Sequence, residues 1–226
     1  MARTRSDKNG ITRGGVAVLG LGRFGSALAL ELVDEGEEVL AADLNPRAVQ
    51  EHAGRLTHVV EADTTSEDAM RGLGLGEFGT VVVSIGTDIE ASILTASVAV
   101  HLGVRNVWAK AISEPHARIL AQIGVDNVVR PEHDMGQRVA HLVRGRMLDY
   151  IEFDDGYVFV KTRPPALLHN RSLTGVGVRQ TYGVTVVGVK PAGGTFTYTT
   201  ADTVIRPDDH IVVSGPQDKV EAFARL

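Results

Sequence analysis

The chain has 226 residues and a net charge of −5 at pH 7, with 43% hydrophobic and 23% charged residues. These values are typical of a globular protein, and the length suits one domain of about 150 residues with a small second lobe. The absence of cysteine excludes disulfides, thiolate catalysis and cysteine-ligated metals. The negative charge argues against a nucleic-acid partner, and no apolar run approaches the roughly 18 residues of a membrane span.

Residues 1–13 are basic and have no apolar core, so they do not form a signal peptide. Their positive charges come from Arg3, Arg5, Lys8 and Arg13. We predict a flexible basic arm. It is either a solvated tail, which the composition favours, or a segment that contacts acidic lipid or a partner.

A glycine motif follows the first apolar run. Residues 15–19 predict a strand, Gly20–Gly25 reads Gly-Leu-Gly-Arg-Phe-Gly, and residues 23–33 are amphipathic and predict a helix. A second apolar run, Val39–Ala42, ends in Asp43. A glycine motif alone is weak evidence, but this order of strand, loop, helix, strand and acid predicts a site for an adenine dinucleotide or nucleotide.

Each residue type in this motif has a physical role. Gly20 allows a tight turn, Gly22 lets the backbone approach phosphates, and Gly25 lets helix and strand pack closely. The free N–H groups and the positive end of the helix dipole then face the phosphates. Asp43 is predicted to accept hydrogen bonds from a ribose hydroxyl, and its charge argues against the 2′-phosphate of NADP.

Strand and helix patterns alternate up to residue 148. The further predicted strands are His58–Asp63, Thr80–Ile85, Asn106–Ala111 and Asn127–Arg130, and the further helices are Ser66–Arg71, Asp88–Leu102, Glu114–Ile123 and Glu132–Leu148. This alternation predicts an α/β fold with a doubly wound, Rossmann-type parallel sheet. Ligands bind such sheets at the carboxyl ends of the strands.

The pattern changes after Tyr150. Short predicted strands alternate with turns rich in Asp, Gly and Pro, and a short helix closes the chain. The strands are Ile151–Phe153, Tyr157–Thr162, Val184–Lys190, Thr195–Thr199 and His210–Ser214, and the helix is Gln217–Arg225. We therefore predict a small α+β C-terminal lobe over residues 149–226.

The second lobe shows no catalytic constellation. Its only histidines, His169 and His210, lie among polar turn residues, and the chain has no HExxH motif. We therefore expect a protein that is not an enzyme and in which nucleotide binding is itself the output. The alternative is a small NAD-dependent dehydrogenase.

Several segments resemble the RCK domain, the nucleotide-binding regulatory domain of Trk and Ktr potassium uptake systems. They are Gly20–Gly25, Ala41–Pro46, Glu61–Thr65, Ser84–Asp88, Val107–Ala111 and Arg130–Gly136, with Tyr182–Val186 and Pro207–Val213 in the second lobe. Pro131–Gly136 and Met147–Ile151 are most similar to the Ktr-type subunits.

The resemblance implies a cytoplasmic subunit, peripheral on the inner face of the membrane. Residues 14–148 would form the RCK N-terminal nucleotide-binding domain and residues 149–226 the RCK C-terminal lobe. Dimers would assemble into an octameric ring beneath an integral membrane potassium-transporting subunit of the KtrB or TrkH type. The ring would bind ATP, ADP or NAD(H), with ATP favouring the active form, and the C-terminal lobe of some relatives binds inactivating cyclic di-AMP. A regulator of another cation channel or antiporter remains an alternative.

The resemblance also implies residue roles. Arg23 would reach the terminal phosphate of a nucleotide in the adjacent subunit, the alternative being a surface arginine with no ligand. Asp63 would contact adenine, the alternative being a helix-capping role shared with Thr64 and Thr65. Lys110 would contact phosphate or pair with an acid, and Glu132 would hold Mg²⁺ or another cation near the phosphates or simply favour the helix dipole. The predicted nucleotide site is Gly20, Gly22, Arg23, Phe24, Gly25, Asp43, Leu44, Asp63, Thr64, Ser84, Ile85, Gly86, Lys110 and Glu132. The predicted cyclic di-AMP site is Val178 and Arg179.

Overall fold

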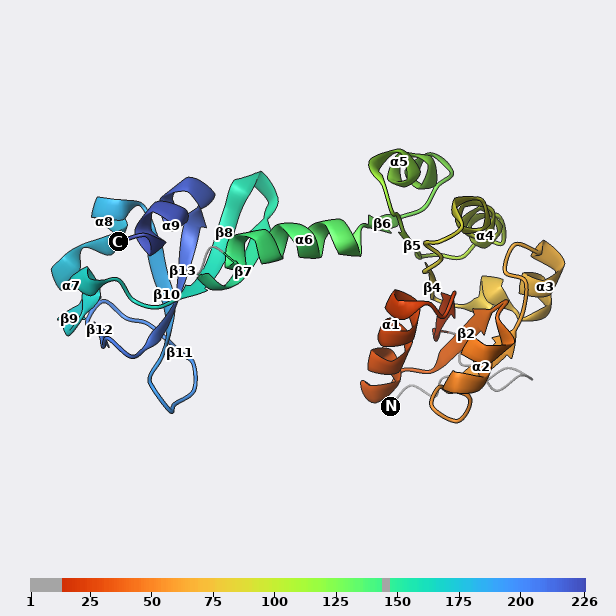
Figure 1. The fold of residues 1–226 in the computed structure, drawn as a ribbon, viewed down its shortest axis with the longest axis horizontal. Coiled ribbons are helices and arrows are strands. Elements are labelled where there is room, and N and C mark those ends of the chain that lie inside the picture. The colour runs from red at the N-terminus through yellow and green to blue at the C-terminus, as the bar shows by residue number, and fades with distance from the viewer. Residues whose placement is uncertain (1–13, 144–146) are drawn as a thin grey trace. The chain divides into compact units, whose positions relative to one another are not determined.

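The computed structural model describes residues 14–143 and 147–226 (Figure 1). The predicted basic arm of residues 1–13 lies outside the described residues. The chain divides into two compact units, residues 1–132 and 133–226. None of the helices in the described part of the chain has the length and apolar character that crossing a bilayer requires.

The first unit contains a six-stranded parallel sheet with the order β3-β2-β1-β4-β5-β6. The strands are β1 (Val16–Leu19), β2 (Val39–Asp43), β3 (His58–Glu61), β4 (Thr80–Val83), β5 (Val107–Lys110) and β6 (Asn127–Val129). The strand order reverses between β1 and β4, which is the switch point where such sheets bind ligands. The predicted doubly wound parallel sheet is confirmed.

Helices cover both faces of this sheet. They are α1 (Arg23–Asp34), α2 (Pro46–His52), α3 (Glu67–Gly72), α4 (Ile89–His101) and α5 (Glu114–Gln122), with a short 3₁₀ turn η1 (Leu75–Glu77). Val18 packs with Ala29 of α1 on one face, whereas the neighbouring Ala17 packs with Met70 of α3 and Ala96 of α4 on the other. Because successive side chains of a strand point to opposite faces, a continuous apolar run buries both.

The second unit is built on a five-stranded antiparallel sheet with the order β11-β10-β13-β8-β7. The strands are β7 (Met147–Phe153), β8 (Tyr157–Thr162), β10 (Thr185–Lys190), β11 (Thr197–Tyr198) and β13 (His210–Pro216). A second, two-stranded sheet pairs β9 (Arg171–Ser172) with β12 (Val204–Ile205). The remaining elements are α7 (Leu173–Val176), α8 (Val178–Tyr182), α9 (Gln217–Ala224), η2 (Asp154–Gly156) and η3 (Ala166–Leu168). The predicted α+β lobe is confirmed.

One predicted helix is too long. Helix α6 (Pro131–Leu142) ends six residues before the predicted end at Leu148, and Met147 and Leu148 are the first residues of β7. Residues 147–153 pair with β8, and Tyr150 packs in the core of the second unit, where it is 4% exposed. The ladder and the burial of this ring therefore override the helical spacing of apolar residues.

Candidate nucleotide-binding site

The glycine loop after β1 requires two of its glycines for steric reasons. Gly20 has a φ of +101°, which other residues rarely adopt. A Cβ on Gly25 would lie 2.0 Å from the carbonyl oxygen of Gly20 and 2.3 Å from the hydroxyl of Ser84. Gly22 is the N-cap of α1, and a Cβ there would meet nothing within 4 Å. The loop is thus tightly packed at Gly25 and open at Gly22.

The start of α1 has the character of an anion site. Among the described residues, no side chain caps the N-terminus of this helix. The first N–H groups of a helix have no partner within the helix and carry the positive end of its dipole. A phosphate placed over Gly22 would satisfy them.

Ser84 fixes the loop from behind. Its hydroxyl donates to the carbonyl oxygen of Gly20 at 2.5 Å, and the residue is 5% exposed. The Ser84 side chain therefore lies beneath the loop, where it positions Gly20. Ile85, which follows it, packs against the core of the first unit.

Asp43, at the end of β2, is hydrogen-bonded to the same loop. Its Oδ2 accepts from the backbone N–H of Leu21 at 2.6 Å, and its Oδ1 accepts from the N–H of Asn45 at 2.7 Å. A carboxylate has about four lone-pair positions, so it retains capacity for ribose hydroxyls. Leu44 beside it is 68% exposed. The role of Leu21 was missed, because the sequence does not reveal a contact through a backbone N–H.

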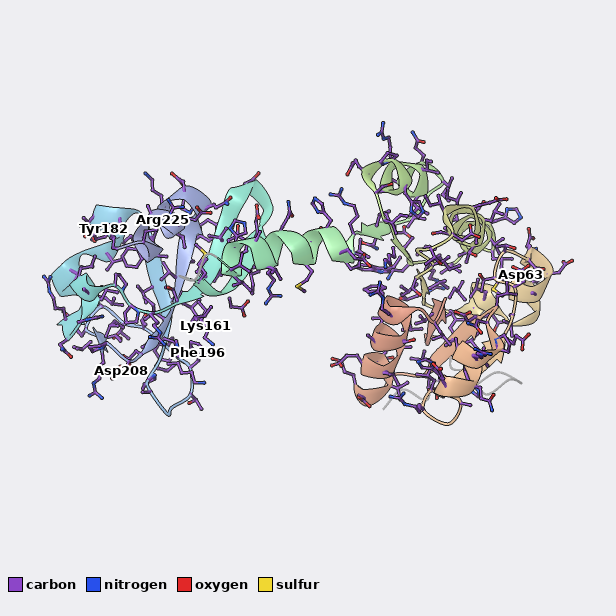
Figure 2. The ribbon with its side chains drawn as sticks, in the orientation of Figure 1. Asp63, Lys161, Tyr182, Phe196, Asp208 and Arg225 are labelled. Atoms are coloured by element: carbon purple, nitrogen blue, oxygen red, sulfur yellow. The ribbon has the colours of Figure 1, made fainter. Side chains whose placement is uncertain are left out.

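Asp63 and Thr64 follow β3, and their side chains point in different directions. Asp63, labelled in Figure 2, accepts from the N–H of Thr65 at 3.0 Å and from its hydroxyl at 2.6 Å. These bonds hold the pKa of Asp63 below its ordinary value. The Thr64 hydroxyl lies 2.8 Å from that of Thr95 in α4, and its residue is 6% exposed. The Thr64 side chain thus faces the helix, and Asp63 remains exposed.

Charged side chains gather beside the start of α1. Lys110 Nζ donates to Glu132 Oε1 at 2.5 Å, and it lies 5.8 Å from the centre of the Phe24 ring. Nζ and Cε of Lys110 would each lie 3.3 Å from a Cβ on Gly86. The hydrogen bond from Lys110 is the main cause that lowers the pKa of Glu132, and the charge of Arg23 adds to it. Arg23 itself is exposed.

The cation predicted at Glu132 would be shared with nucleotide phosphates, and it stays a prediction. In this structure the Glu132 carboxylate is bound to Lys110. Within residues 14–143 and 147–226, no group of three His, Cys, Asp or Glu side chains is placed to hold a metal ion. We therefore assign no step to a cation.

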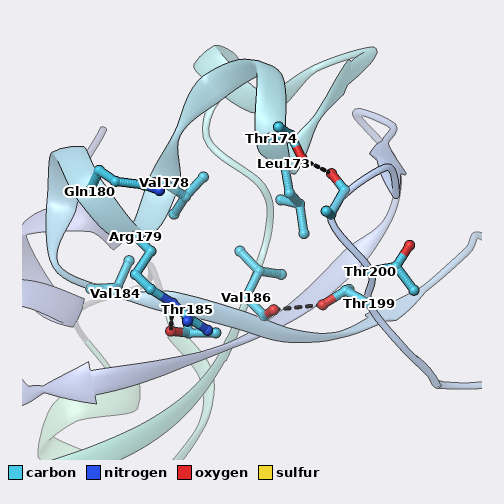
Figure 3. Close-up of a pocket in the computed structure, with 11 residues that line it drawn as sticks. Leu173, Thr174, Val178, Arg179, Gln180, Val184, Thr185, Val186, Thr199 and Thr200 are labelled. Atoms are coloured by element: carbon cyan, nitrogen blue, oxygen red, sulfur yellow. Dashed lines mark hydrogen bonds between the residues drawn. The ribbon is translucent and has the colours of Figure 1, made fainter.

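A pocket in the second unit contains the two residues predicted for cyclic di-AMP. Figure 3 shows Val178 and Arg179 in its wall, and the pocket has a volume of about 350 Å³. Val178 is 5% exposed, and Arg179 Nε donates to the hydroxyl of Thr185 at 3.2 Å. Further lining residues were missed in the sequence: Leu173, Thr174, Gln180, Val184, Thr185, Val186, Thr199, Thr200 and Ala201. The adjacent threonines Thr199 and Thr200 were a signal in the sequence that could have pointed to this pocket.

Comparisons with known proteins match both units. The family profile "TrkA-N domain" matches residues 16–131, and "TrkA-C domain" matches residues 157–226. "Ktr system potassium uptake protein C" of Bacillus subtilis is 36% identical over 210 residues, covering 92% of this chain and 95% of that protein. "Ktr system potassium uptake protein A" of Vibrio alginolyticus is 37% identical over 205 residues, covering 90% and 93%.

Solved structures share the fold. The "GsuK RCK domain" has a TM-score of 0.68 and 16% identity, covering 100% of this chain and 50% of that chain. The "GsuK channel bound to NAD" has a TM-score of 0.69 and 16% identity, and the match covers 99% of this chain and 40% of that chain. This chain therefore spans half or less of the length of these solved chains.

The fold and the glycine loop define a Rossmann-like nucleotide-binding class of protein with an α+β C-terminal lobe. The chain belongs to the TrkA-N/TrkA-C (RCK) family of potassium transport proteins and is a homologue of the Ktr potassium uptake proteins. The family expected from the sequence is confirmed.

Proposed function

We propose that this chain is a nucleotide-binding regulatory subunit of a Ktr- or Trk-type potassium transporter and not an enzyme. Residues 14–148 would form its nucleotide-binding domain and residues 149–226 its C-terminal lobe. Copies of the chain assemble into a ring on the inner face of the membrane. Exchange of ATP and ADP changes the shape of this ring, and the change opens or closes an integral membrane partner of the KtrB or TrkH type.

The observation that carries the proposal is the open glycine loop at the switch point. Asp43 is hydrogen-bonded to the loop through Leu21, and the start of α1 has no side-chain cap among the described residues. These features provide an acceptor for ribose and donors for phosphate on one rigid loop. The titles of solved structures with this fold support the ligand class, since GsuK is described as bound to NAD and as bound to ADP.

Arg23 supplies a way to tell ATP from ADP. A ligand shifts a conformational equilibrium only through a difference in its interactions with the two states. Reversing a population from about 1:99 to 99:1 requires roughly 5.5 kcal/mol, or about 0.7 kcal/mol at each of eight sites. One charge-assisted hydrogen bond from an arginine to the terminal phosphate is sufficient. We assign this contact to Arg23 and a phosphate bound in a neighbouring copy.

Calorimetry tests the binding step. The full chain should bind ATP, ADP and NADH, and NADPH should bind at least tenfold more weakly because Asp43 repels a 2′-phosphate. Rescue of potassium uptake by this chain, expressed with its membrane partner in bacteria that lack uptake systems, tests the transport role. Turnover of a coenzyme with a small metabolite would instead support the dehydrogenase alternative.

We also propose cyclic di-AMP as the ligand of the pocket in the second unit. Its volume of about 350 Å³ lies within the usual range for ligand sites. Val178 offers an apolar contact for a base, and the guanidinium of Arg179 can contact phosphate or stack on a base. Arg179→Ala should weaken cyclic di-AMP binding at least tenfold and leave ATP binding unchanged. Equal affinity in the variant and the wild type would exclude Arg179 from this site.

A further inference from the structure

The β10–β11 hairpin, residues 185–198, carries two exposed aromatic rings. It forms one edge of the five-stranded sheet and projects from that sheet in Figure 1. Phe196 is 47% exposed and Tyr198 is 78% exposed, and neither ring belongs to the hydrophobic core of the second unit. Aromatic rings exposed together in this way indicate a surface that contacts a partner.

Two lysines flank the Phe196 ring (Figure 2). Nζ of Lys161 lies 5.6 Å from the centre of this ring, and Nζ of Lys190 lies 5.8 Å from it. The two side chains come from β8 and β10, the strands on either side of β13. Their neighbours Val160 and Val189 are buried in the core. Because successive side chains of a strand alternate, both lysines lie on the face of the sheet that points away from this core.

The positive charge of this face has little compensation nearby. Among the residues that the structure describes, neither Lys161 nor Lys190 forms an ion pair. Asp149 interacts with the charge of Lys161, but its carboxylate is bound to Arg138. Residues 185–201 include no Asp or Glu. The hairpin therefore presents two aromatic rings beside two ammonium groups.

A bilayer surface with anionic lipids matches this combination. Aromatic rings settle at the level of the lipid headgroups, and lysine side chains are attracted to anionic headgroups. A bilayer accepts projecting rings without a preformed pocket, which a protein partner would have to supply. The whole chain has a net charge of −5, so an anionic surface repels it except where positive charge is concentrated.

We propose that the β10–β11 hairpin, with Phe196, Tyr198, Lys161 and Lys190, docks the second unit on a membrane surface that contains anionic lipids. The inference goes beyond the proposed nucleotide switch and rests on that proposal only for the location at a membrane. Two lysines and two rings give a weak contact in each copy. Several copies in one assembly multiply it, which would hold the regulator close to its membrane partner.

Sedimentation of the full chain with lipid vesicles tests the inference. Vesicles of phosphatidylcholine with phosphatidylglycerol should bind the chain at least tenfold more strongly than vesicles of phosphatidylcholine alone, and added salt should weaken this binding. Lys161→Gln and Lys190→Gln should each weaken it about fivefold, the effect expected of one lysine near an anionic surface. Tyr198→Ser, which removes a ring exposed to solvent, should weaken it as well.

Lys219→Gln is the matched control. Lys219 lies in α9 of the same unit, and its side chain is 58% exposed, so the substitution removes one positive charge outside the hairpin. It should change vesicle binding less than twofold. A thermal unfolding scan of each variant separates loss of fold from loss of binding.

The outcomes separate this inference from the proposed function. Equal binding to both kinds of vesicle overturns the inference, and so does an equal loss of binding in Lys219→Gln. A wild-type chain that binds neither kind of vesicle also overturns it, and loss of potassium uptake in the hairpin variants would then assign the hairpin to a protein partner. Normal ATP binding by the same preparations leaves the proposed function standing in each case. Vesicle binding as predicted, in a chain that binds no nucleotide, overturns the proposed function and supports the inference.

Discussion

The side chain of Asp43 accepts a hydrogen bond from the backbone N–H of Leu21 at 2.6 Å. This bond connects the end of β2 to the glycine loop that follows β1, and β1 and β2 are neighbours in the sheet. The acid that would bind ribose therefore also fixes the loop that would bind phosphate. The ribose and the phosphates of a nucleotide would therefore contact parts of the site that are hydrogen-bonded to each other.

Asp43→Ala should weaken both the fold and the nucleotide site. Removing the carboxylate leaves two backbone N–H groups without their acceptor, which costs about 1–3 kcal/mol in the free energy of unfolding when such groups are not solvated. ATP and ADP affinities should fall at least tenfold, because the ribose acceptor is lost as well. Chemical denaturation and calorimetry measure the two effects. Asp68→Ala, at an acid in the first turn of α3, is the control, and wild-type affinity in Asp43→Ala would contradict the assigned role.

The two helix-start glycines should respond differently to alanine. Gly25→Ala places a Cβ 2.0 Å from the Gly20 carbonyl oxygen, so the loop or helix must shift, and we expect a loss of at least 3 kcal/mol or failure to fold. The Cβ that Gly22→Ala adds meets no atom within 4 Å, so this variant should unfold at nearly the wild-type temperature. Its methyl group should nevertheless obstruct the phosphate and lower ATP affinity. Equal thermal stability of the two variants would refute the packing argument.

Arg23→Ala should remove the difference between ATP and ADP and leave ADP binding within about threefold of the wild type. The side chain is exposed, so the fold should be unaffected. Arg47→Ala, at an exposed arginine in the first turn of α2, is the matched control. The readout is the ratio of potassium uptake with ATP to uptake with ADP. A wild-type ratio in Arg23→Ala would remove this residue from the mechanism.

His116 should make the first unit sensitive to mild acid. The residue is 2% exposed, and burial lowers its pKa from the ordinary value of 6.5. Below pH 6.5 the unfolded chain therefore takes up a proton that the folded chain resists, and stability falls until the pH reaches the lower folded pKa. The free energy of unfolding should decrease from pH 7.5 to 5.5, and less so in His116→Asn, which retains an acceptor for the N–H of Ile112. Parallel curves for the two proteins would contradict this assignment.

The sequence was sufficient for the parallel sheet because its signals are local. Val81–Val83 is an unbroken run of valines, and all three side chains, which alternate between the two faces of the sheet, belong to buried residues. Ser66, the first residue of the predicted helix Ser66–Arg71, is the N-cap of α3, and its hydroxyl accepts from the N–H of Ala69. Helix α2 was not among the predicted elements, although Asn45 caps it and Pro46 starts it. At seven residues, it is too short for a clear apolar period.

The candidate site was less predictable because side-chain direction depends on distant contacts. Ser84 and Thr64 occupy the expected strand ends. The Ser84 hydroxyl, however, donates to the carbonyl oxygen of Gly20, and the Thr64 hydroxyl is hydrogen-bonded to that of Thr95. The pairing of Lys110 with Glu132 joins residues 22 apart in the chain. The sequence offered a phosphate or an unspecified acid as the partner of Lys110, and neither spacing nor composition identifies Glu132 as that acid.

Small-angle X-ray scattering of the purified full chain, with ATP and then with ADP, tests most directly whether the nucleotide is a signal. We predict the same large particle mass with both ligands, equal to a ring of subunits, and a measurable difference in the shape of the scattering curve. A single-chain mass, or identical curves with both nucleotides at saturation, would contradict the account.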